Sequence, residues 1–183
     1  MEDEHNPVKN ILYEIINEKP EESIQKEIVN KNSQGVIKEL ISKAYPKVLK
    51  LEGDVDENIA KLSTSLLHYL LAISFIPSQR KVIQNEINID IVIPDLQTLS
   101  TNPKESLIIC IPELHKLENI DEQITKAETI QPFNENIWVV EEKRKGNNKK
   151  SYSIYDGTIS KILDDINEFL SSKKKIQFKI FRV

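Results

Sequence analysis

The sequence predicts an α/β (α+β) protein in which a mixed central sheet is flanked by helices and follows an all-helical N-terminal extension. Apolar residues recur at helical spacing through most of residues 8–74. Short β-branched runs follow, and a helical segment between two of them is typical of a parallel crossover. We expect the extension to cover residues 1–53 and the α/β domain to cover residues 54–183.

Three short helices are expected in the extension, over residues 8–19, 24–29 and 36–45. Their isoleucines cannot all be exposed to solvent, because burying one fully contributes about 2 kcal/mol. They should pack on residues 56–75 or on a second copy of the chain, and a homodimer or protein partner is therefore expected at these helices. The residues concerned are Ile11, Ile15, Ile24, Ile28, Ile37 and Ile41.

Beyond residue 54 the pattern alternates between helical and extended. The expected elements are a helix over 56–74, a hairpin of strands over 80–84 and 89–95, a loop over 96–105, a buried strand over 107–111, a helix over 117–130, a buried strand over 137–140, a short strand at 152–155 and a helix from 156. Strict alternation over 176–183 predicts a final strand with one exposed face.

Composition excludes several classes of protein. The chain has 183 residues, 39% of them hydrophobic, which is enough to bury a core. No apolar run approaches the roughly 18 residues of a membrane helix, and the acidic start MEDEHN lacks the features of a signal peptide. A single cysteine, Cys110, excludes a disulfide scaffold. We therefore expect a soluble, cytoplasmic protein.

One acid, Asp90, interrupts the β-branched run before the loop, and the next strand, over 107–112, carries Cys110 and Pro112. With the helices on either side, the order from Leu66 to Val140 resembles the core of the PD-(D/E)xK, or restriction-endonuclease-like, nuclease superfamily. The resemblance implies that Asp90 corresponds to an aspartate that binds a divalent metal. Cys110 stands where the superfamily has a second acid, and Pro112 stands where it has a lysine.

This departure matters because of the chemistry. Mg²⁺ takes oxygen ligands, and phosphodiester hydrolysis also needs an activated water. The thiol of Cys110 supplies no oxygen ligand, and Pro112 supplies no ammonium that could orient or activate the water. Asp90 is therefore either an acid on the exposed face of an edge strand or a surviving metal ligand. A rearranged catalytic site would draw on Asp90, Glu113 and Lys116, since the last two lie just beyond the strand.

Positive charge is concentrated near the end of the chain. Residues 141–183 hold eleven lysines and arginines against six acids, whereas residues 1–60 hold eight against thirteen. Tyr152 and Tyr155 either stack on bases or pack on the sheet. The basic residues belong either to a surface that contacts the phosphates of a nucleic acid or to a solvated loop. A pI near 5.5 argues against a dedicated DNA-binding protein. The candidate phosphate contacts are Lys143, Arg144, Lys145, Lys149 and Lys150.

Three functions are compatible with these patterns. The first is a non-catalytic protein of nuclease-like fold that acts as a binding or assembly module, without a cofactor and with weak affinity for nucleic acid. The second is a nuclease that depends on Mg²⁺ at a rearranged site. The third is an interaction protein of an unrelated α/β fold. We favour the first, because the acid–lysine pair is missing while the apolar pattern is intact.

Overall fold

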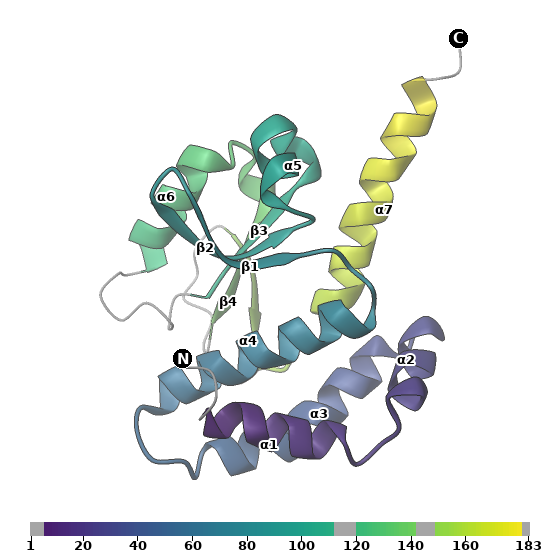
Figure 1. Ribbon diagram of the computed structural model, residues 1–183, viewed down its shortest axis with the longest axis vertical. Helices are drawn as coiled ribbons and strands as arrows, with labels where there is room; N and C mark the ends of the chain where they lie inside the picture. Colours follow the sequence, from purple (N-terminus) through teal and green to yellow (C-terminus); the bar gives the residue numbers. More distant parts are fainter. Residues whose placement is uncertain (1–5, 112–119, 142–148, 181–183) are drawn as a thin grey trace.

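A computed structural model describes residues 6–111, 120–141 and 149–180, with the side chains of the last helix described as far as Lys173 (Figure 1). Its helices are α1 (Pro7–Ile16), α2 (Glu21–Val29), α3 (Ser33–Val48), α4 (Val55–Ile73), α5 (Leu96–Thr101), α6 (Ile120–Ile130) and α7 (Ile162–Ile180). Its strands are β1 (Gln79–Gln84), β2 (Ile87–Ile93), β3 (Leu107–Cys110), β4 (Ile137–Glu141) and β5 (Lys150–Ser153). Short 3-10 turns include η1 (Pro103–Glu105) and η4 (Thr158–Lys161).

The described strands form one mixed sheet in the order β1-β2-β3-β4-β5. The pairings of β2 with β1 and with β3 are antiparallel, and the pairings of β4 with β3 and with β5 are parallel. Helix α6 connects β3 to β4, as a parallel crossover requires. The prediction of a mixed sheet flanked by helices is therefore confirmed.

The sheet separates two groups of helices (Figure 1), and an apolar cluster lies on each of its faces. Side chains on one face, including Ile109 and Trp138, pack in a core that also contains α4, α7 and the N-terminal helices. Side chains on the other face, including Ile108 and Cys110, pack with α5 and α6. Each central strand is therefore covered on both faces, which explains why β3 and β4 are apolar without interruption.

The N-terminal helices share the larger core, as their isoleucine pattern predicts. Ile15, Ile24 and Ile37 are buried, and the other three predicted isoleucines are partly buried against the same cluster. Polar contacts join this part of the chain to α7, because Asp164 accepts hydrogen bonds from the Ser33 hydroxyl and from the side chain of Gln34. The isoleucines thus find their partners within the chain.

Helix α4 begins and ends at clear local signals. The Asp54 carboxylate accepts a hydrogen bond from the Glu57 backbone N–H at 3.0 Å, which caps the first turn. At the other end Phe75 takes the left-handed conformation (φ 53°), and the Ile76 N–H donates to the carbonyl of Leu71. This is a Schellman ending in which phenylalanine takes the position usually given to glycine.

Two predictions of secondary structure are wrong. Residues 96–105 form α5 and η1 instead of a loop, because Asp95 accepts a hydrogen bond from the Thr98 N–H at 2.7 Å and caps a six-residue helix. The strand predicted over 176–183 is helical as far as Ile180, and residues 181–183 lie outside the described part. No glycine or proline lies between residues 162 and 180, so no residue there breaks the helix.

Replacing a buried isoleucine of the extension should destabilise the whole protein. We expect Ile37→Ala to lower the free energy of unfolding by about 2–5 kcal/mol, since it leaves a cavity in the shared core. Ile83 of β1 is 65% exposed, and Ile83→Ala is the matched control, with an expected loss below about 1 kcal/mol. Urea unfolding followed by circular dichroism measures both. Equal effects of the two variants would contradict the shared core.

Candidate functional site

Asp90 lies inside the sheet and not at its edge. Ile91 pairs with Ile109 and Val92 with Ile108, and this register places Asp90 beside Cys110. Strand β1 forms the edge, and only 7% of Asp90 is exposed. The expectation of an acid on the exposed face of an edge strand is therefore wrong. The polar strand β1 pairs with β2 on its outer side, and α6 covers the face on which Asp90 lies.

The Asp90 carboxylate joins three elements through its hydrogen bonds. Its Oδ2 atom accepts a hydrogen bond from the backbone N–H of Ile111 at 2.7 Å, directly beyond the end of β3. The same oxygen accepts a hydrogen bond from Nε2 of Gln123 on α6 at 3.2 Å. Asp90 therefore fixes both the end of β3 and the position of α6 on the sheet.

Cys110 lies next to Asp90 and is buried. Burial raises the pKa of the thiol well above its ordinary value, the negative charge of Asp90 raises it further, and the Lys149 ammonium opposes this effect. The thiol is therefore protonated at neutral pH. A protonated thiol is neither a metal ligand nor an effective nucleophile.

Two buried polar residues on the same face add oxygen atoms to this region. Glu141, the last residue of β4, is 2% exposed and lies two positions beyond Val139, which pairs with Cys110. Gln123 is 5% exposed, and its Oε1 has no hydrogen-bond partner within the described part of the chain. Sequence reasoning passed over Glu141, although an acid directly after the apolar run of β4 is a detectable signal.

The described residues do not group into a metal centre. Within residues 6–111, 120–141 and 149–173, no three histidine, cysteine, aspartate or glutamate side chains lie together so that they could hold an ion. Glu113 and Lys116, the other candidates for a rearranged site, lie outside the described residues. Their placement relative to Asp90 therefore stays a prediction.

Two of the five candidate phosphate contacts take part in interactions within the chain. The Lys149 ammonium contacts the Glu128 carboxylate at 2.6 Å, and the Lys149 side chain is 8% exposed. Lys150 contacts Asp165 at 3.0 Å and lies 4.4 Å from the centroid of the Trp138 ring. The remaining three candidates, Lys143, Arg144 and Lys145, lie outside the described residues.

The two tyrosines beside this basic segment differ. Tyr152 is buried, its hydroxyl donates to Asp165 at 2.7 Å, and its ring lies 5.6 Å from that of Trp138. Tyr152 therefore packs on the sheet. This is the second of the two roles expected for it, and base stacking is the first. Tyr155 is 65% exposed, so stacking on a base stays a prediction for this residue.

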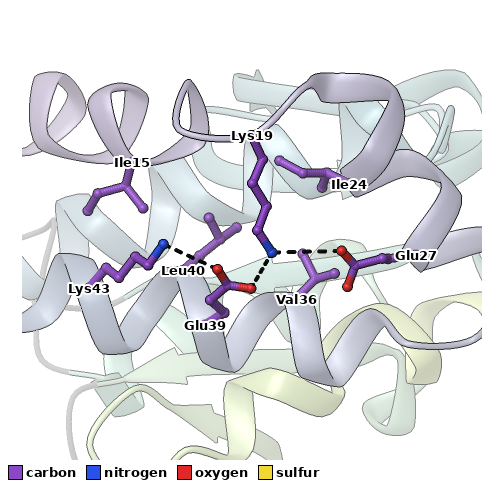
Figure 2. Close-up of a pocket in the computed structure, with 8 residues that line it drawn as sticks. All are labelled: Ile15, Lys19, Ile24, Glu27, Val36, Glu39, Leu40 and Lys43. Carbon is purple, nitrogen blue, oxygen red and sulfur yellow. Dashed lines mark hydrogen bonds and ion pairs between the residues drawn. The ribbon is translucent and has the colours of Figure 1, made fainter.

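A pocket lies between α1, α2 and α3 (Figure 2). These helices lie on the opposite side of α4 from α6 (Figure 1). Lys19 contacts Glu39 and Glu27, and Lys43 contacts Glu39 and Glu18, so acids and bases alternate around the rim. The apolar lining consists of Ile15, Ile24, Val36 and Leu40. Because its charges compensate one another, the pocket has the features of a helix junction and not of a ligand site.

We predict that Asp90→Ala destabilises the protein by about 2 kcal/mol or more. The change leaves the buried N–H groups of Ile111 and Gln123 without this acceptor, and each buried donor left unsatisfied costs about 1–3 kcal/mol. Asn88→Ala, an exposed change on the same strand, is the control and should have a small effect. Urea unfolding gives both values. A more stable Asp90→Ala variant would show that the carboxylate is held at a cost, as expected for a binding residue.

The ion pairs of Lys19 and Lys43 predict that the stability of the protein depends on pH, and Figure 2 shows those that involve Glu39. Hydrogen bonds from Lys19 and Lys43 lower the pKa of Glu39, and a hydrogen bond from Lys43 lowers the pKa of Glu18, from ordinary values of 4.5. Their stabilising contribution is therefore complete above pH 4.5 and is lost as pH falls through the lowered values. Thermal unfolding of Glu39→Gln should lose part of this acid dependence, whereas the exposed change Glu14→Gln should keep it.

Comparison with known proteins gives no further guide to the activity. No family model, curated protein or solved structure matches the chain. Among the residues that the structure describes, no helix has the length and apolar character needed to cross a membrane. The function must therefore be inferred from the contacts around Asp90 and from the basic segment.

Proposed function

We propose that this chain is a non-catalytic binding or assembly module built on a nuclease-like core. The observation that supports this proposal is the use of Asp90, the residue at the position of a metal ligand, as an internal hydrogen-bond acceptor. Its Oδ2 atom accepts hydrogen bonds from the Ile111 N–H beyond the end of β3 and from Nε2 of Gln123 on α6. In this role the acid stabilises the fold and needs no cation.

The neighbouring residues support the same proposal. A catalytic centre of this class would need a second carboxylate beside Asp90, and the residue there is a buried, protonated cysteine. Pro112 supplies no ammonium at the position where the superfamily has a lysine. The hydrogen bonds of Asp90 direct one of its two oxygens toward protein donors, which leaves less of the carboxylate for coordinating Mg²⁺.

A protein partner would find apolar side chains on the N-terminal helices. Tyr13 of α1 is 47% exposed, Val29 of α2 is 75% exposed and Leu49, just beyond α3, is 42% exposed. A second copy of the chain or another protein is therefore the partner proposed for these helices, whose isoleucines are already used in the core.

Nucleic acid is the other proposed partner, with weak affinity. Lys149 and Lys150 contact acids of the same chain, so phosphate contacts would depend mainly on Lys143, Arg144 and Lys145. Each contact with duplex DNA releases close to one counterion, so three contacts give a log–log salt slope of about −3. The excess of acids in residues 1–60 opposes binding to a polyanion.

We expect duplex DNA binding to be detectable only at low salt and to be lost when Lys143, Arg144 and Lys145 are changed together to glutamine. The paired change of Lys149 and Lys150 to glutamine is the matched control, and it should weaken binding much less. Fluorescence anisotropy over a salt series measures affinity and slope. If the change of Lys149 and Lys150 abolished binding and the change of Lys143, Arg144 and Lys145 did not, the phosphates would be bound at the start of β5 and the proposed contacts would be wrong. If the unmodified chain failed to bind at low salt, nucleic acid would be excluded as a partner and only protein partners would remain.

A metal-dependent nuclease with a rearranged site is the second candidate. Two buried groups on the face of the sheet that holds Asp90 favour it, namely the Glu141 carboxylate at the end of β4 and Oε1 of Gln123 on α6. Both are ligand types that Mg²⁺ accepts. For this function, the carboxylate of Asp90 would have to give up a hydrogen bond from Ile111 or Gln123 and bind the cation instead.

Incubation of the chain with single- and double-stranded DNA and RNA in Mg²⁺ or Mn²⁺ separates the two candidates. The proposed binding module should cleave none of these substrates, and neither cation should raise its melting temperature. Cleavage that is abolished by Asp90→Asn and by Glu141→Gln would establish the nuclease instead. Asp56→Asn, an exposed change on α4, controls for a contaminating activity, because it should leave genuine cleavage unchanged.

A further inference from the structure

We draw no further inference here: the strongest candidate, the apolar surface at Phe75 just beyond the end of α4, where the side chain is 82% exposed, carries no proposal because nothing in the structure shows what covers it.

Discussion

The burial of the Asp90 carboxylate is the constraint on which the arrangement of the sheet and α6 depends. A carboxylate that is 7% exposed must find hydrogen-bond donors, since an uncompensated buried charge is expensive. The N–H of Ile111 and the side chain of Gln123 supply them. The same side chain therefore links the end of β3 to α6.

Amide side chains hold the rest of that layer in a similar way. Nε2 of Gln131 donates to the carbonyls of Pro103 and Ser106 at 2.8 and 2.9 Å, and Nδ2 of Asn136 donates to the carbonyl of Lys104 at 3.1 Å. These bonds attach the turn before β3 to the segment between α6 and β4. Directional contacts thus supplement apolar packing on the side of the sheet that has the smaller core.

The sequence predicted best those elements whose apolar pattern lies within the element itself. Helix α4 and strands β3 and β4 lie within one or two residues of their expected bounds, because the apolar residues of α4 recur at helical spacing and those of the two strands form unbroken runs of four. Helix α5 was missed because six residues with a single cap carry little periodicity. The alternation after residue 176 was misleading, since a strand also needs a partner at a sheet edge, and pairing is not a local property.

The candidate site was predictable only in part, for a similar reason. The strand that carries Asp90 was predicted, but the burial of this residue depends on β1 taking the edge and on α6 covering the face. Both are relations between segments far apart in the sequence. The pairing of Lys149 with Glu128 on α6 is another such relation, which the charge pattern of the basic segment alone does not contain.

The core shared by the N-terminal helices and the sheet has a consequence for folding. Because Ile37 of α3 and Ile109 of β3 belong to one apolar cluster, neither part can expose its surface without exposing that of the other. The helices and the sheet are thus expected to open as one cooperative unit, with slow amide hydrogen exchange in α3 and β3 reporting the same global event.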